Sequence, residues 1–588
     1  MRRKQKLELT WVGKENRPRL EPRILLEDPE KSYHATHRVR EEDVFDNRLI
    51  FGDNLLALKA LEQEFSGKVK CVYIDPPFNT QQAFEHYEDG LEHSLWLSLM
   101  RDRLQIIHRL VSEDGSVFVH IDDNELAYLL VMIDEIFGRR NRISIITFKQ
   151  GSATGHKSIN PGVVSTSNFI LLYAKNKLHW KPNRVFTARA DRDKRYGQYI
   201  ENVDDDYSDW RFSTLSKAFS RSLGIPERGL KKALGEDFEP KITQFVHENA
   251  GAVIQLARPN YDAVSSAARQ LIDESRRNDK KVLKLARDGY SDIYLIGGQR
   301  ILFYSEKLKL VDGQYVPGEP LTSIWDDILS NNLHNEGGVE FPKGKKPEAL
   351  IKRCFDLTSD KGDWVLDSFA GSGTTGAVAH KMGRRWIMVE LGEHCRTHII
   401  PRLKNVIDGE DKGGVTEAVG WQGGGGFRYF KLAPSLLETD KWGREVISKT
   451  YNAEMLAEAL CKIEGFAYAP SDAVYWQHGH STERDFIYVT TQTLGIDQLQ
   501  QLSEEVGSDR SLLVLCSAFR GNADRWPNLT VKKIPNHIRF RCEWGHDDYS
   551  LNVENLPKAS AMAEPEGAAP DKAAKQPDLF GAKNGGGR

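Results

Sequence analysis

Short apolar runs alternate with segments of helical periodicity between residues 45 and 178. The run VKCVYID (69–75) has the length and the branched side chains of a buried strand, and GSVFVHID (115–122) is a second such run. Residues 95–111 and 125–138 carry apolar side chains at helical spacing. Strands that alternate with helices in this way predict a parallel α/β sheet.

The same rhythm returns between residues 341 and 406. The pattern predicts a helix over 347–358, a strand over 363–369, a helix after Gly373 and a strand over 385–390. The residues in between, 179–320, lose the alternation and are rich in Arg, Lys, Asp and Ser. We therefore expect an α/β protein with a doubly wound, mostly parallel sheet whose two halves flank an inserted domain.

These shifts in pattern divide the chain into six segments. The run GWQGGGG (420–426) is typical of a linker, and the Ala- and Pro-rich end of the chain is typical of disorder. The predicted segments are an N-terminal arm (1–44), a first half of the α/β domain (45–178), an insert (179–320), a second half (321–420), a small C-terminal α/β module (427–555) and a disordered tail (556–588).

Composition narrows the class of protein. The 588 residues are 40% hydrophobic and 28% charged, with a net charge of −3, which is ordinary for a globular protein. No apolar run is long enough to cross a bilayer, and the basic start is not followed by the apolar stretch of a signal peptide. The six cysteines are scattered, which argues against a zinc module and a disulfide framework. We expect a cytoplasmic protein without a metal site or membrane contact, and we interpret HCRTH (394–398) as part of a helix with surface histidines.

A glycine loop joins two of the predicted elements in the second half. In WVLDSFAGSGTTGAVAHKMGRRWIMVEL (364–391), one strand ends at Asp367 and the next ends at Glu390. Ligands of doubly wound sheets bind beyond the carboxyl ends of the strands, glycines admit a close backbone approach, and an acid on the second strand can accept hydrogen bonds from ribose hydroxyls. The string G-x-G-x-x-G (371–376) would also suit a dinucleotide, whereas a phosphate loop would require a Lys that is missing here.

The segment VYIDPPFNT (72–80) indicates which kind of group the chain could activate. Two prolines cannot continue a central strand, so they form a rigid loop at its end, where Asp75 and Phe78 can face a ligand. An exocyclic amine is a weak nucleophile because its lone pair is delocalised into the ring. Asp75 can accept one N–H of such an amine and a carbonyl of the Pro-Pro segment the other, which frees the lone pair for attack on a methyl sulfonium. Phe78 offers a face on which an extruded base can stack.

DPPF and FAGSGTT together resemble the amino-methyltransferases of DNA. Their order along the chain is similar to that of the β class, a circular permutation of the Rossmann-like, S-adenosylmethionine-dependent methyltransferase fold. The opening KLELTWVGKENRPRLEPRILLED and GFRYFKL (426–432) resemble the modification subunits of type III restriction systems. The resemblance extends over residues 6–178 and 320–432. It implies that 45–178 is the catalytic half, 321–420 the cofactor-binding half and 179–320 a target-recognition insert.

The resemblance also implies the site residues. The catalytic set is Asp75, Pro76, Pro77 and Phe78. SNFILLYAKN (167–176) resembles a strand that lines the target-base pocket. Contacts with S-adenosylmethionine are carried over to Asp53, Asn54, Lys346, Pro347, Asp367, Phe369, Ala370, Gly371, Ser372, Gly373, Thr374 and Glu390.

We therefore interpret the chain as a site-specific DNA methyltransferase that modifies N6 of a flipped adenine, because Asp at the position of Asp75 goes with adenine in this family and Ser with cytosine. A cytosine-N4 methyltransferase, an NAD-dependent oxidoreductase based on the glycine string, and a DNA-binding specificity subunit with a dead active site are the alternatives. The implied partners are double-stranded DNA, contacted by the basic insert, a separate restriction or helicase subunit, and a second copy in a homodimer. QPDLF (576–580) resembles the peptide with which bacterial proteins dock onto the sliding clamp.

Overall fold

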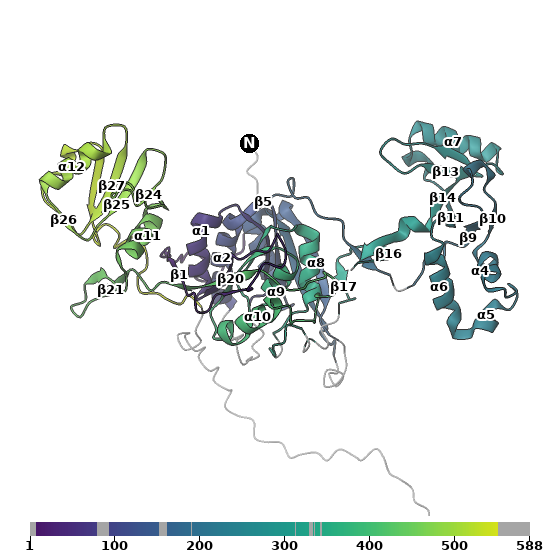
Figure 1. Ribbon diagram of the computed structural model, residues 1–588, viewed down its shortest axis with the longest axis horizontal. Helices are drawn as coiled ribbons and strands as arrows, with labels where there is room; N and C mark the ends of the chain where they lie inside the picture. The colour runs from purple at the N-terminus through teal and green to yellow at the C-terminus, as the bar shows by residue number, and fades with distance from the viewer. Residues whose placement is uncertain are drawn as a thin grey trace, which may run out of the picture.

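The computed structural model has three bodies in a row, with the insert on one side of a central body and the C-terminal module on the other (Figure 1). The described residues are 8–78, 93–151, 162–189, 191–311, 313–328, 333, 336–341 and 344–550. The predicted tail (556–588), including QPDLF, lies outside them. None of the described helices has the length and the apolar run that crossing a membrane requires.

The central body is built on an eleven-stranded sheet with the order β1-β20-β3-β19-β18-β4-β5-β7-β6-β17. Its edge strands are β1 (Leu25–Glu27) and β17 (Ile324–Trp325), and β2 (Tyr33–His34) pairs with β20. The strands from β20 to β5 run parallel, whereas β7 is antiparallel to β5 and β6. The main strands are β3 (Asn47–Phe51), β4 (Val69–Ile74), β5 (Val111–Ile121), β6 (Arg142–Lys149), β7 (Ser167–Ala174), β18 (Trp364–Asp367), β19 (Arg385–Glu390) and β20 (Gly426–Leu432).

Helices cover both faces of this sheet, because alternate side chains of each strand are apolar. On β4, Val72 and Ile74 join the core beneath the helices of one face, and Cys71 and Tyr73 join the core of the other. The first face carries α1 (Asn54–Phe65), α2 (His93–Leu110) and α3 (Leu126–Ile133), and the second carries α8 (Glu348–Thr358), α9 (Thr374–Lys381) and α10 (Ile400–Ile407). The predicted doubly wound α/β fold is confirmed, with β18 and β19 of the second half placed between β3 and β4.

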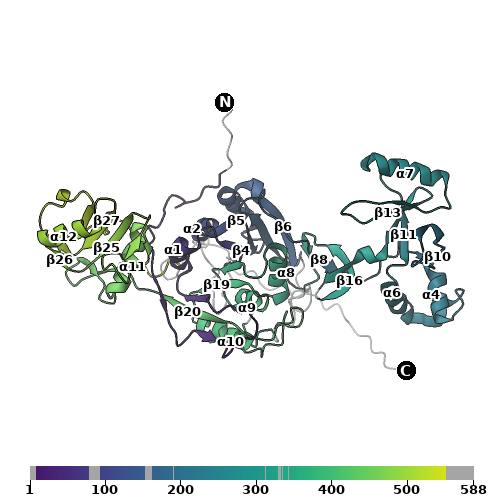
Figure 2. The same ribbon diagram turned by 45° about the horizontal axis from the view of Figure 1, so that its top comes forward.

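The insert protrudes from the central body on a three-stranded stem, β15-β16-β8, whose strands β8 and β16 lead out to it in Figure 2. It has its own six-stranded sheet and its own buried clusters, so it is a separately packed unit. Its strands and α-helices are β8 (Phe186–Ala188), β9 (Gln198–Ile200), β10 (Phe212–Thr214), α4 (Leu215–Leu223), α5 (Leu230–Leu234), α6 (Phe238–Glu248), β11 (Val253–Ala257), α7 (Ser266–Arg277), β12 (Leu283–Leu285), β13 (Ile293–Ile296), β14 (Gln299–Phe303), β15 (Leu308–Val311) and β16 (Gln314–Pro320).

The C-terminal module is a five-stranded sheet with two helices against it. β25 (Asp485–Val489), β27 (Ser511–Cys516) and β29 (Leu529–Lys533) are parallel, and α11 (Ala453–Glu464) and α12 (Ile496–Val506) cover the sheet. The module begins later than the predicted boundary at 427. β20 pairs in parallel with β3 and buries Phe427 and Tyr429 in the central core, so these residues belong to the central sheet.

The interpretation of 420–426 as a linker is wrong. Gly423, Gly424, Gly425 and Gly426 are buried. The Gly424 N–H donates to the carbonyl of Ile407 at 2.8 Å, and a Cβ on Gly423 would lie 2.9 Å from that same carbonyl oxygen. The glycines therefore allow a close approach of two backbone segments, and the turn leads directly into β20.

A buried charge cluster ties α8, α9 and α10 together. Glu348 accepts hydrogen bonds from Lys381 and Arg402, each at 2.7 Å, and all three side chains are fully buried. Asp411 lies 2.7 Å from Lys381 and supplies a second carboxylate. Charges buried this deeply require complete pairing, because an unpaired one would lose its hydration without compensation.

We predict that Glu348→Ala lowers the free energy of unfolding by about 3 kcal/mol or more, because Lys381 and Arg402 lose a shared buried partner. Urea denaturation of the full chain measures this change. The matched control is Asp327→Ala, which breaks the half-exposed pair with Arg353 and should cost about 1 kcal/mol or less. Equal effects of the two substitutions would contradict the prediction.

Candidate active site

The two sequence motifs meet at the carboxyl ends of neighbouring strands. β4 and β18 are adjacent and parallel, with Leu366 opposite Val72, so that Asp75, which follows β4, and Asp367, the last residue of β18, lie at the same edge of the sheet. Burial raises the pKa of Asp367 to about 7. Hydrogen bonds from the Thr375 side chain and the Phe369 N–H lower this pKa, whereas the negative charge of Asp75 raises it. The two carboxyl groups are therefore electrostatic neighbours, although they lie almost 300 residues apart in the chain.

The Asp75–Phe78 loop, which the sequence predicts to be the catalytic loop, is held by a buried tryptophan. Trp96, on α2, donates its indole N–H to the carbonyl of Pro77 at 2.8 Å and is inaccessible to solvent. Within the described part of the chain, the Pro76 carbonyl receives no hydrogen bond. The site therefore offers the Asp75 carboxylate and the Pro76 carbonyl as acceptors for a ligand. Sequence reasoning missed Trp96, because an apolar helix position carries no signal of such a contact.

Lys346 joins the catalytic loop from the segment before α8. Its ammonium forms an ion pair with Asp75 and lies 5.1 Å from the centroid of the Phe78 ring. Pro347 precedes the first residue of α8 and so sets where that helix begins. Lys346 was predicted to contact the cofactor, which stays a prediction, and the structure places its ammonium beside Asp75 and Phe78.

The glycine loop has a backbone that only glycine adopts readily. Gly371 and Gly373 have φ of +52° and +75°, and a Cβ on Gly373 would lie 2.9 Å from Ile399. Ala370 donates its N–H to the Val389 carbonyl at 3.1 Å, which ties the loop to β19. Phe369 packs against the core beneath α1 and α2.

Glu390 closes the loop from the end of β19. Its carboxylate accepts the N–H groups of Gly371, Leu391 and Gly392 at 2.8, 2.9 and 3.0 Å. His394 lies 3.0 Å from the same carboxylate. The acid predicted to accept ribose hydroxyls therefore also shapes the loop that would cradle the ligand.

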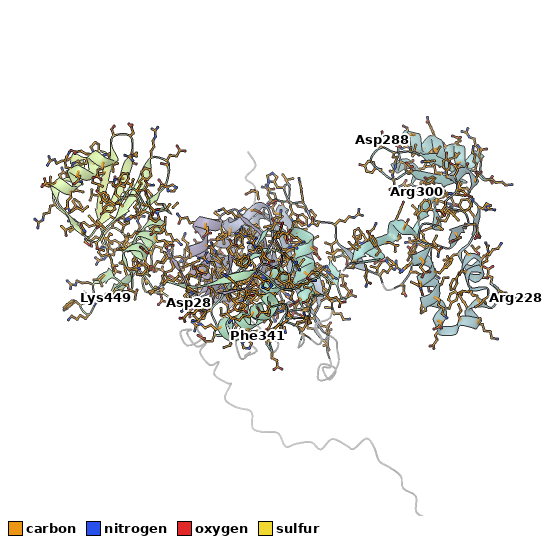
Figure 3. The ribbon with its side chains drawn as sticks, in the orientation of Figure 1. Asp28, Arg228, Asp288, Arg300, Phe341 and Lys449 are labelled. Carbon is orange, nitrogen blue, oxygen red and sulfur yellow. The ribbon has the colours of Figure 1, made fainter. Side chains whose placement is uncertain are left out.

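His394 is buried, so the prediction that the histidines of 394–398 are surface residues is wrong for this one. Phe341, labelled in Figure 3, covers it with a ring-to-ring distance of 5.4 Å and lies 5.6 Å from the ring of His398. Phe341 thus packs over the segment that follows β19. A short histidine-containing string cannot show this, because the covering side chain comes from another segment.

Arg402 supports the glycine loop from below. Its guanidinium donates to the Thr374 hydroxyl at 2.7 Å and to the Ser372 carbonyl at 3.3 Å, and the Ser372 and Thr374 hydroxyls are 3.1 Å apart. Through Glu348, this arginine connects the loop to the buried charge cluster. Arg402 was missed because it lies outside every motif.

Asp53 and Asn54 are engaged within the protein. Buried Asp53 accepts the N–H of Tyr549 at 3.0 Å and lies 3.4 Å from Arg103. Asn54 donates to the carbonyl of Ser368 at 2.8 Å and accepts a hydrogen bond from Arg103. Of these two residues, which the resemblance assigned to the cofactor, Asn54 holds the backbone of Ser368, the residue that follows Asp367, and Asp53 holds Tyr549 and Arg103.

Tyr549 arrives from the C-terminal end of the described chain. Residues 543–550 lead from the module to the central body, and on the way buried Arg23 donates to the carbonyl of His546 at 2.9 Å and to Asp547 at 2.8 Å. The Tyr549 ring packs against the core beneath α1 and α2. The sequence gives no sign of this return, because it joins residues almost 500 positions apart.

Comparison with known proteins agrees with this arrangement. The family described as DNA methylase matches residues 69–400, more than half of the chain. The probable type III restriction-modification enzyme HindVI Mod subunit of Haemophilus influenzae is 32% identical over 445 residues, covering 71% of this chain and 58% of the relative. The EcoP15I Mod subunit of Escherichia coli is 27% identical over 461 residues, covering 66% and 65%. The type II methyltransferase M.EcaI of Enterobacter cloacae is 36% identical over 357 residues, covering 59% and 67%.

This chain thus spans about three fifths of the length of the two Mod subunits. The family match includes the Asp75–Phe78 loop, the glycine loop and the two adjacent strands, β4 and β18, that carry them. A dinucleotide-binding oxidoreductase would leave the first of these loops unexplained. We conclude that the chain belongs to the DNA methylase family.

Proposed function

We propose that this protein is a site-specific DNA methyltransferase that transfers a methyl group from S-adenosylmethionine to N6 of an adenine turned out of the double helix. The observation that carries the proposal is the meeting of the Asp75–Phe78 loop with the glycine loop at one edge of the sheet. S-adenosylmethionine bound at the glycine loop would face an adenine bound at the Asp75–Phe78 loop. This is the arrangement that direct transfer of a methyl group requires.

The residues around the glycine loop fit the proposed cofactor. The loop backbone is open to close approach, and the buried Ser368 hydroxyl has no hydrogen-bond partner among the described residues. Asp367, Glu390 and the backbone from 369 to 373 would hold the bound molecule. When bound, S-adenosylmethionine supplies a methyl carbon that its sulfonium makes electrophilic. In this proposal Asn54 also positions the Ser368 carbonyl, and the cofactor contacts of Asp53 and Asn54 stay predictions from the sequence.

The chain's own groups would activate the amine. Asp75 accepts one N–H and the Pro76 carbonyl accepts the other, so that the nitrogen lone pair points toward the methyl group and the carboxylate stabilises the positive charge that develops on nitrogen. Phe78 stacks on the base. No thiolate nucleophile is required. Cys71, on β4 itself, is buried, which raises the pKa of its thiol to about 12.

The partners belong to the same proposal. The insert would read the target sequence, because it projects from the central body and carries exposed cations such as Arg228 at its far end (Figure 3). Because the two Mod relatives are named as subunits of type III enzymes, we propose that a separate restriction subunit joins this chain in the cytoplasm. A homodimer and a sliding-clamp contact through 576–580 remain predictions from the sequence.

The first test is the product. DNA from cells that express the full chain should contain N6-methyladenine after digestion to nucleosides and mass spectrometry, and sequencing with methylation detection should place it at one recurring sequence. DNA from cells that express the Asp75→Ala variant is the control. N4-methylcytosine in its place would mean that the target base is cytosine, and no methylated nucleoside would contradict the proposed function.

The second test removes the catalytic carboxylate. We expect Asp75→Ala to reduce the methyl transfer rate by roughly 100-fold or more, because an acceptor that aligns the amine is lost. Calorimetry should show S-adenosylmethionine binding within about twofold of the wild type, since the glycine loop is intact. The matched control is Asp114→Asn, which changes an exposed carboxylate paired with Lys70. An active Asp75→Ala enzyme would argue against the assigned role.

The raised pKa of Asp367 predicts a pH dependence of stability. The folded pKa of about 7 lies above the ordinary value of 3.8, so the folded chain binds a proton that the unfolded chain releases. The contribution of protonated Asp367 to the free energy of unfolding is thus fully present below about pH 4, and it is lost as the pH rises through 7. Between pH 5.5 and 8, the free energy of unfolding of the wild type should fall by about 2 kcal/mol relative to Asp367→Asn. Urea denaturation at both pH values, without cofactor, measures this difference, and a constant difference would contradict the prediction.

A further inference from the structure

A buried histidine lies directly behind the catalytic loop. His120 is near the carboxyl end of β5, the strand next to β4, and its side chain is inaccessible to solvent. The Tyr73 hydroxyl lies 2.8 Å from its Nδ1, and the Asn168 amide lies 3.2 Å from its Nε2. Tyr73 comes from β4 and Asn168 from β7, so three strands meet at this ring.

The His120 ring is stacked with Phe78 of the catalytic loop. Their centroids are 5.7 Å apart, and the ring planes are inclined by 29°. Edge contacts from Tyr73 at 6.3 Å and Phe148 at 5.8 Å limit sideways movement of the imidazole. Two hydrogen bonds fix the plane of the imidazole, and one face of the imidazole lies against the Phe78 ring.

The imidazole is neutral in this setting. Burial lowers the pKa of His120 well below its ordinary value, and the positive charge of Lys346 lowers it further. A neutral ring has one donor and one acceptor nitrogen: the Asn168 amide nitrogen donates to Nε2, and the Nδ1–H then donates to the Tyr73 hydroxyl oxygen. The three groups are therefore satisfied together without a buried charge, which allows a rigid aromatic support at this position.

We infer that His120 is a positioning residue for the target base, because it holds the Phe78 ring at a fixed angle so that the extruded base stacks on a preset face. This inference rests on the proposed function. Base stacking on an aromatic side chain depends on where that ring lies, and a displaced base would carry its amine away from Asp75 and the Pro76 carbonyl. His120 itself touches neither base nor cofactor in this role.

The test compares His120→Ala with a variant that restores a ring. We expect His120→Ala to lower kcat by about 10-fold to 100-fold on a duplex that contains the recurring methylation site, with affinity for S-adenosylmethionine within about twofold of the wild type. The double variant His120→Phe/Tyr73→Phe places a flat ring behind Phe78 and removes the hydroxyl that would lose its partner. It should recover most of the rate. His108→Ala, which removes another histidine in edge contact with a phenylalanine, is the control.

Each outcome decides the inference. A wild-type rate for His120→Ala overturns it, and so does a folded, cofactor-binding double variant that is as slow as His120→Ala. A parallel loss of cofactor affinity and kcat also overturns it, because such a loss would mean a general disturbance of the sheet edge. If the wild type itself methylates no DNA, the proposed function fails, whereas an active wild type with an insensitive His120 refutes the positioning role alone.

Discussion

The parallel pairing of β4 with β18 is the contact on which the rest of the site depends. It joins a strand from the first half of the chain to one from the second, and it brings Asp75 and Asp367 to one edge of the sheet. Parallel strands that end together form a crevice beyond their carboxyl ends, which is where doubly wound folds bind ligands. The insert can then lie outside the sheet, because its stem leaves and returns at the β6 end of it.

The buried ion pair of Glu348 and Arg402 lies beneath the glycine loop and makes this edge of the sheet rigid. Arg402 is fixed by Glu348 inside the protein and reaches Ser372 and Thr374, so the loop is anchored from its interior side. Glu390 anchors the same loop through the Gly371 N–H. A site that must align two reacting groups benefits from such supports, because small displacements have large effects on transfer rates.

The conformation of the Asp75–Phe78 loop was predictable from the local sequence. The apolar strand, the two prolines and Phe78 were sufficient to predict a rigid loop at a strand end, because proline restricts the backbone wherever it occurs. The supports of that loop were not predictable in the same way. Trp96 lies in an apolar helix pattern and His120 in an apolar strand pattern. In such patterns, core packing explains a tryptophan or a histidine as well as a role in supporting the loop does.

The sequence by itself determined the α/β class, the circular order of the halves and the two loops that carry the chemistry, since periodicity, proline and glycine act through neighbouring residues. Only the tertiary structure decided that β20 joins the central sheet, that the 420–426 glycines form a packed turn, and that Tyr549 reaches Asp53. These features come from contacts between segments far apart in the chain. Such contacts depend on shape and buried hydrogen bonding, which leave no periodic trace in a single sequence.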